Sequence, residues 1–201
     1  PKADPILHRQ YAEELLADAR EREQTERLAR LALRARPNDA AAVSILARLA
    51  WNDGRRDEAV ELHRHAACLS DKDEWLARAY FSAARMLRHE EEALRFMRDR
   101  VQRHHSKSSQ PARTLYTALM SLDRATEARD VLDEALNSRP QDGELLLFAA
   151  EADAAVGESD RAAARIEEAR PWCRRGDWLR AAATLAAGRG DLAASLTLWR
   201  E

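Results

Sequence analysis

Apolar residues recur every three or four positions along nearly the whole chain, in stretches of roughly a dozen residues separated by short polar turns. The clearest stretch is Ala40–Ala67, AAAVSILARLAWNDGRRDEAVELHRHAA, which predicts two amphipathic helices joined at Asn52-Asp53-Gly54. Few stretches alternate with period two, and the good helix formers Ala, Leu, Arg and Glu dominate the composition. The pattern therefore predicts an all-α chain with short turns.

This pair of helices recurs with a period of about 34 residues, which indicates a helical repeat. A small residue marks the same place in five second helices, at successive spacings of 34, 35, 34 and 33 residues: Ala59, Ala93, Ala128, Ala162 and Ser195. Glycine marks the turn inside three units and proline the exit from two: Gly54, Gly157, Gly190, Pro37 and Pro140. The register gives units at about 6–39, 40–73, 74–108, 109–142, 143–175 and 176–201, with the last truncated.

Small residues stand where the two helices of a unit have to approach each other, for example Ala47, Ala59 and Ala66. A side chain no larger than a methyl group lets the two helix surfaces meet without a bulky group between them. One hairpin cannot bury its apolar face alone, so we expect successive hairpins to stack and share a continuous core.

These markers resemble the tetratricopeptide repeat (TPR) family. The second unit carries the pattern most fully, and the fourth, fifth and sixth follow it: Val43, Leu46-Ala47, Ala50, Ala59, His63 and Ala66. The third unit departs from it with Tyr80-Phe81 and Arg100, and the first has Glu13 at its small position, so we expect distortion there. The resemblance covers the chain and implies a right-handed superhelix of stacked hairpins, an α-solenoid, forming one domain over residues 1–201.

The composition narrows the class of protein. The chain has 201 residues, 45% hydrophobic and 34% charged, with no apolar run long enough to span a membrane. The net charge of −2 disfavours a nucleic-acid binder. Only three basic residues are Lys and the rest are Arg, a bias that favours a bacterial source. We find no targeting signal, interpret both ends as cuts from a longer protein, and leave the compartment open between cytoplasm and periplasm.

TPR arrays usually bind partners in the groove lined by the first helices of their hairpins. Carried over residue by residue, the resemblance implies a partner-binding groove made by these positions: Arg48, Trp51, Asn52, Trp75, Arg78, Ser82, Arg85, Arg113, Thr117, Arg180 and Thr184. The alternatives are a solvated face without a ligand and, for the tryptophans, packing between hairpins.

Three units place an Arg and a hydroxyl four residues apart on this face: Arg78/Ser82, Arg113/Thr117 and Arg180/Thr184. Residues four apart lie on the same side of a helix, so each pair could present a guanidinium and a hydroxyl to one anionic group. We therefore expect an acidic peptide or another anionic polymer as the ligand.

No constellation for catalysis, metal binding or cofactor binding is visible. The chain lacks a Gly-rich phosphate loop, a nucleophile elbow and HExxH, and its two cysteines do not have metal-ligand spacing. We expect no cofactor and no enzyme activity in this chain, and interpret it as a protein–protein interaction scaffold, in its specific version a bacterial assembly or export scaffold. Two alternatives stay open: a regulatory or targeting region of a larger enzyme such as a glycosyltransferase, and self-association through the terminal hairpins.

Overall fold

The computed structural model describes residues 4–201, and over these residues the chain is α-helical without a β-strand. The all-α prediction is therefore confirmed. The chain divides into two compact units, residues 1–100 and 101–201. Unit 1 holds α1 (Pro5–Leu15), a 3-10 turn (Ala19–Glu21), α2 (Arg22–Ala35), α3 (Ala40–Asn52), α4 (Arg56–Leu69), α5 (Glu74–Met86) and most of α6 (Glu90–His104). Unit 2 holds α7 (Gln110–Met120), α8 (Ala125–Ser138), α9 (Gly143–Ala155), α10 (Ser159–Ala169), α11 (Arg175–Gly188) and α12 (Leu192–Arg200).

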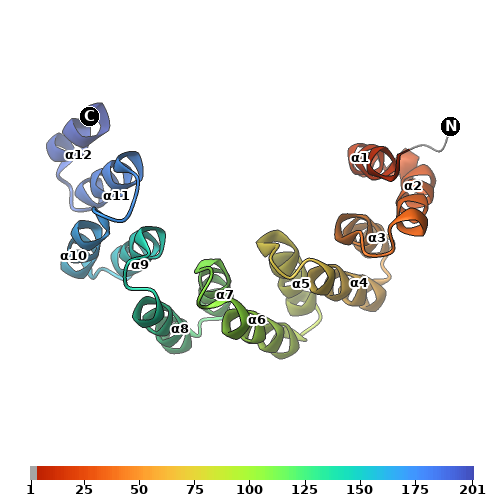
Figure 1. The fold of residues 1–201 in the computed structure, drawn as a ribbon, viewed down its shortest axis with the longest axis horizontal. Coiled ribbons are helices and arrows are strands. Elements are labelled where there is room, and N and C mark those ends of the chain that lie inside the picture. The colour runs from red at the N-terminus through yellow and green to blue at the C-terminus, as the bar shows by residue number, and fades with distance from the viewer. Residues whose placement is uncertain (1–3) are drawn as a thin grey trace. The chain divides into compact units, whose positions relative to one another are not determined.

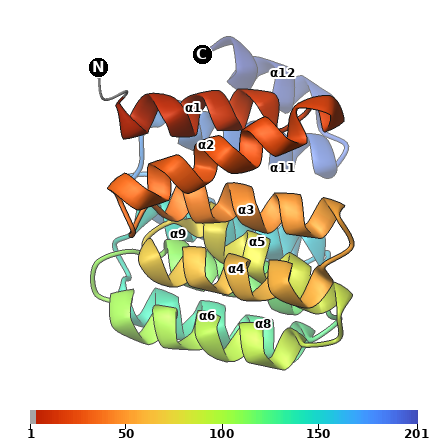
Figure 2. The same ribbon diagram turned by 90° about the vertical axis from the view of Figure 1, so that its right-hand side faces the viewer.

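Consecutive helices pair into antiparallel hairpins inside each unit. In unit 1, α1 packs on α2 and α3 on α4, while α2 contacts α3 and α4 contacts α5 (Figures 1 and 2). The first helices α1, α3 and α5 lie on one side of this unit and the second helices on the other (Figure 1). Unit 2 repeats the arrangement with α7–α8, α9–α10 and α11–α12. Whether the two units continue as one solenoid domain stays a prediction.

An aspartate caps the N-terminus of four first helices. Asp39 accepts a hydrogen bond from the backbone N–H of Ala42 at 3.1 Å, and Asp73 and Asp142 cap α5 and α9 in the same way. Asp4 caps α1, with Pro5 in the first turn. A carboxylate at this position satisfies free backbone donors and interacts favourably with the helix dipole. The caps therefore fix where these four helices begin.

The turn inside the hairpin requires a left-handed residue. Gly54, Gly157 and Gly190 have φ angles of 80°, 86° and 81°. The third and fourth hairpins use Arg88 and Asp123 at the same place, with φ of 62° and 58°. The turn geometry is thus kept even where glycine is absent, at a modest cost in backbone energy.

The small residues of the repeat form the contact between paired helices. Ala47, Ala59 and Ala66 are fully buried, as the pattern predicts. In the first hairpin the buried small residue is Ala12, whereas Glu13 is exposed, so the assignment of Glu13 to this position is wrong. The Asp4 cap starts α1 one residue earlier than the repeat count suggests, and the 3-10 turn before α2 takes up the difference.

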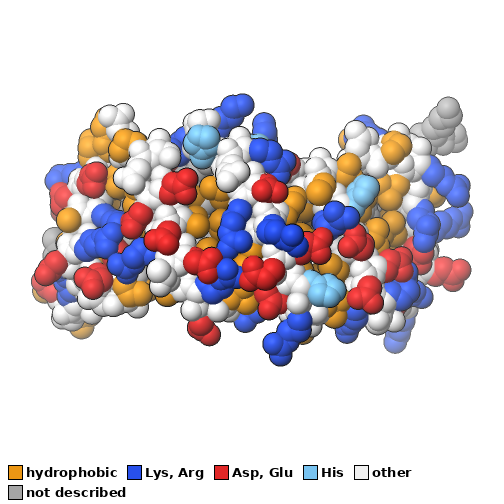
Figure 3. Space-filling view, turned by 90° about the horizontal axis from the view of Figure 1, so that it is seen from below, with side chains coloured by type: hydrophobic (Ala, Val, Ile, Leu, Met, Phe, Trp, Pro, Cys, Tyr) orange, Lys and Arg blue, Asp and Glu red, His pale blue; other side chains and the backbone are white. Residues whose placement is uncertain are grey.

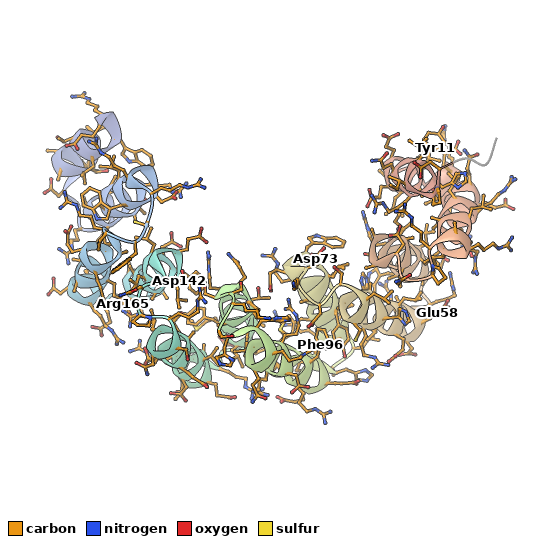
Figure 4. All side chains as sticks on the ribbon, viewed as in Figure 1. Tyr11, Glu58, Asp73, Phe96, Asp142 and Arg165 are labelled. Atoms are coloured by element: carbon orange, nitrogen blue, oxygen red, sulfur yellow. The ribbon has the colours of Figure 1, made fainter. Side chains whose placement is uncertain are left out.

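The third hairpin has an ion pair at a position where other hairpins have a small residue. Arg100 is only 1% exposed and stands where the second, fourth and fifth hairpins have alanine. Its guanidinium donates to both carboxylate oxygens of Glu74, at 2.8 and 3.1 Å, and its Nε donates to the carbonyl of Asp71 at 2.9 Å. The Tyr80 and Phe96 rings meet edge to face in the same hairpin, with their centroids 5.6 Å apart. Figure 4 shows Phe96 and Asp73 on opposite sides of α5. The hairpin accommodates Arg100 by giving each of the three guanidinium nitrogens a hydrogen-bond acceptor.

The fifth hairpin has small residues at the two positions that the ion pair occupies in the third hairpin. Gly143, the counterpart of Glu74, begins α9, and a Cβ there would lie 2.4 Å from the carbonyl oxygen of Trp172. The backbones therefore meet directly where only glycine fits, and Ala169, the counterpart of Arg100, is fully buried. The start of the first helix and the end of the second helix are therefore held together in one of two ways. In the fifth hairpin small residues allow direct contact, and in the third hairpin a bidentate ion pair joins the two helices.

His63 fills an apolar position of the repeat. Its counterparts Met97, Leu132 and Ile166 are all buried, and His63 itself is 7% exposed. Burial, together with the nearby Arg48 guanidinium, lowers the pKa of His63 to about 4. The imidazole is therefore neutral in the folded chain at neutral pH, and it behaves as a core side chain.

Removing one partner of the buried ion pair should destabilise the chain more than removing both. We expect Arg100→Met to lower the free energy of unfolding by about 3–5 kcal/mol, because Glu74 keeps a charge with little access to water. The double variant Arg100→Met, Glu74→Gln should lose clearly less than the sum of the two single variants. Urea unfolding of the four proteins measures this coupling, and strictly additive losses would contradict it.

Lowering the pH should reduce the stability of the folded chain through the buried imidazole of His63. The unfolded chain binds a proton at His63 near pH 6.5 and the folded chain only near pH 4, so stability falls as pH drops between these values and the loss is complete below pH 4. The loss amounts to at most about 3 kcal/mol. His63→Leu should remove this part of the pH dependence in denaturation experiments at pH 7.5, 6, 5 and 4. An unchanged difference between pH 7.5 and pH 4 would show that His63 does not cause it.

Candidate functional site

The first-helix side of unit 1 carries two adjoining hollows. The larger, of about 600 Å³, lies among α1, α3, the end of α4 and the start of α5, and its walls include Arg9, Arg36, Ser44 and Arg48. The smaller, of about 400 Å³, lies between α3 and α5. Arg48 and Trp75 line both, so the two hollows form one groove, called here the unit 1 groove.

Five of the residues predicted for partner binding come together at the smaller hollow. Its walls are mainly apolar and are completed by residues that the sequence prediction did not include: Arg48, Trp51, Asn52, Trp75 and Ser82 from the prediction, with His63, Ala79, Ala83 and Met86 in addition. Trp75 is 51% exposed and Met86 70% exposed, which leaves large apolar surfaces open on this side. Arg78 and Arg85 are exposed on α5 but line neither hollow.

Three buried polar atoms in these walls have no hydrogen-bond partner. One is the Nε of Arg9, on the wall of the larger hollow. Ser44 is 3% exposed and its Oγ is unpaired, on the wall of the larger hollow. His63 Nδ1 is unpaired on the wall of the smaller hollow. A ligand that supplies a hydrogen bond to such an atom gains about 0.5–1.5 kcal/mol from it. The only sequence signal for His63 was a polar residue at an apolar position of the repeat.

Guanidinium groups outnumber free carboxylates in the larger hollow. Asp39 and Asp73 use their carboxylates as helix caps, and Asp39 also lies 3.8 Å from Arg9. Within the described part of the chain, neither Arg36 nor Arg48 forms an ion pair, and both are exposed. The hollow is therefore suited to a negatively charged group. By contrast, acidic and basic side chains are interleaved over the second helices (Figure 3).

The predicted positions of unit 2 are engaged within the unit. The Arg113 guanidinium stacks on the Phe148 ring at 4.8 Å and lies 3.7 Å from Glu144, while Arg180 pairs with Asp177 at 2.6 Å. The hydroxyls of Thr117 and Thr184 donate to the carbonyls of Arg113 and Arg180, at 3.0 and 2.8 Å. Hydroxyls in helices commonly bond back to the carbonyl four residues earlier. Each of these two hydroxyls thus gives its proton to the helix and not to a shared anion.

The tryptophans have different surroundings. The Trp51 ring is half-buried under the guanidinium of Arg56, at 4.1 Å, so one of its faces is occupied. Trp178 packs in the core of unit 2 with Arg170 over its ring. Trp75 therefore presents the largest open aromatic surface of the unit 1 groove.

Neither a cluster of metal-ligating side chains nor a membrane-spanning helix is found among the described residues. Residues 4–201 contain no group of three or more His, Cys, Asp or Glu side chains arranged to hold a metal ion. Of the helices in this part of the chain, none combines the length and the apolar character that crossing a bilayer requires.

The sequence matches no family model and no curated protein, whereas the structure resembles several solved ones. PilF of Pseudomonas aeruginosa is 17% identical, with 96% of this chain and 88% of that chain covered and a TM-score of 0.54. PilW, described as a widely conserved type IV pilus biogenesis factor, is 16% identical over 96% of this chain and 90% of its own, with a TM-score of 0.52.

A third solved structure is described as a tetratricopeptide repeat protein, from Parabacteroides merdae. It is 12% identical, covers 98% of this chain and 76% of its own length, and has a TM-score of 0.53. At these identities the likeness concerns the fold, and it agrees with the repeat register and with the buried small residues of each hairpin. The chain therefore has the fold of a tetratricopeptide repeat protein.

Proposed function

We propose that this chain is an interaction scaffold that binds a segment of a partner protein along the first helices of its hairpins. The unit 1 groove is the observation that carries the proposal, because it combines open aromatic surface, unpaired guanidinium groups and unsatisfied buried polar atoms. Aromatic and arginine side chains in a preformed hollow are the usual anchors of protein interfaces. A groove that is already formed also avoids part of the ordering cost of binding.

The partner segment is acidic in this proposal. Arg48 and Arg36 in the unit 1 groove, with Arg78 and Arg85 exposed beside it on α5, offer several positive charges to an approaching chain. Complementary charge raises the association rate and disfavours basic competitors. In its specific version, the scaffold serves bacterial assembly or export, a role that the description of PilW as a pilus biogenesis factor suggests by analogy.

A photo-crosslinker placed in the groove should capture this partner. We expect p-benzoylphenylalanine in place of Trp75 to yield one discrete crosslinked protein in the source cells, and the same probe in place of Arg95, exposed on α6, to yield none. Arg78→Glu should reduce the yield roughly tenfold, the effect of about 1.4 kcal/mol. Arg113→Glu tests the same charge preference in unit 2. Equal crosslinking from both probe positions, or unchanged yield in Arg78→Glu, would contradict the proposal.

A second proposal, self-association, is supported by the last helix. Leu192, Leu196 and Trp199 lie one turn apart on α12 and are 65%, 57% and 59% exposed. The counterparts of Leu196 and Trp199 in α4 are Val60 and His63, which are both buried, and α4 packs on α5 of the next hairpin. A face of this kind is suited to another helix.

Sedimentation at increasing concentration tests this second proposal. We expect the 201-residue chain to associate in a concentration-dependent way, and Trp199→Asp to lower the apparent association constant at least about tenfold, because the substitution places a charge in the buried contact. Val156→Asp, at an exposed apolar position directly after α9 and outside the terminal hairpins, is the surface control. A chain that stays monomeric at high concentration would exclude this role for α12.

A further inference from the structure

The two parts of the unit 1 groove differ in chemistry, and this difference defines a partner motif. The larger hollow is polar, with Arg9, Arg36 and Arg48 around the buried hydroxyl of Ser44. The carboxylates of Asp39 and Asp73 face their own helix N-termini, and only Glu13 remains as a free acid on this wall. An anionic group here would meet Arg48 and Ser44, which are one helical turn apart on α3.

The smaller hollow is suited to a large apolar side chain. Ala79 and Ala83 leave space on α5, and the open surfaces of Trp75 and Met86 border it. Aromatic rings and methionine make favourable contacts with an inserted aromatic ring. The unpaired Nδ1 of His63 adds one polar atom to a wall that is otherwise mostly apolar, and Arg48 is the charged group that faces it from α3.

The distance between the hollows follows from α3 itself. This helix lines the larger hollow from Ala40 to Arg48 and the smaller one from Arg48 to Asn52. The middles of these stretches are about six residues apart, which is roughly 9 Å along a helix. An extended peptide covers that distance in about three residues.

We propose that the unit 1 groove recognises an extended segment in which Asp or Glu stands three residues from an aromatic residue. The carboxylate binds Arg48 and receives a hydrogen bond from Ser44, and the aromatic ring enters the hollow bordered by Trp75 and Met86. This inference rests on the proposed function and specifies its ligand. It locates recognition in α3 and α5, so the Arg/hydroxyl pairs of unit 2 are not required for it.

Selection of a random octapeptide library on the full chain tests the motif directly. We expect the enriched peptides to pair an acidic residue with an aromatic one three positions away, and Arg48→Glu to exchange the acidic residue for lysine or arginine. Ala79→Leu, which fills the apolar hollow, should weaken binding of the selected peptides at least about tenfold. Arg95→Glu on α6 is the matched control and should leave the selection unchanged, with far-UV circular dichroism confirming that each variant folds.

The outcomes separate the motif from the function it rests on. Peptides that bind the groove without this pairing, or a pairing that persists in Arg48→Glu, would overturn the motif and leave the interaction scaffold in place. A selection that yields no peptide binding to the groove would count against the scaffold itself. Retained affinity in Ala79→Leu would show that the aromatic residue binds elsewhere.

Discussion

Each hairpin is built on a close contact between its two helices. Fully buried alanines at 47, 59 and 66 allow this contact, and their counterparts recur along the chain. Because the contact sets how far apart paired helices lie, it also fixes which side chains remain on the outer surface of the first helices. The unit 1 groove is thus a consequence of packing, made by residues that the close contact does not use.

The third hairpin shows how far this contact can be relaxed. Arg100 replaces an alanine that is otherwise buried, and Glu74 and the Asp71 carbonyl satisfy its guanidinium. The fifth hairpin closes the same end by direct backbone contact at Gly143. Two chemically unrelated solutions therefore maintain one architecture, because what the stack requires is a filled and hydrogen-bonded hairpin end rather than a particular residue.

Two side chains of the unit 1 groove are buried in the helix packing and also line its hollows. His63 occupies a core position and at the same time leaves Nδ1 unpaired on the wall of the smaller hollow. Ser44 does the same at the larger hollow. Such atoms offer hydrogen bonds to a ligand with matching groups. Unit 2 presents its arginines differently, since Arg113 and Arg180 already contact acidic side chains of the same unit.

Turn and periodicity signals act over a few residues and repeat along the chain, so they were enough to predict the helices, their hairpin register and most of the small positions. The sequence also placed Arg48, Trp51 and Trp75 on the side that carries the groove. Only the tertiary structure decided that Ala12 and not Glu13 packs in the first hairpin, that Arg100 is paired, and that Ser44 and His63 are unsatisfied. It likewise revealed that the Thr117 and Thr184 hydroxyls bond to their own helices. These outcomes depend on which neighbours a side chain meets across helices, and that information is not contained in the spacing of residues along one helix.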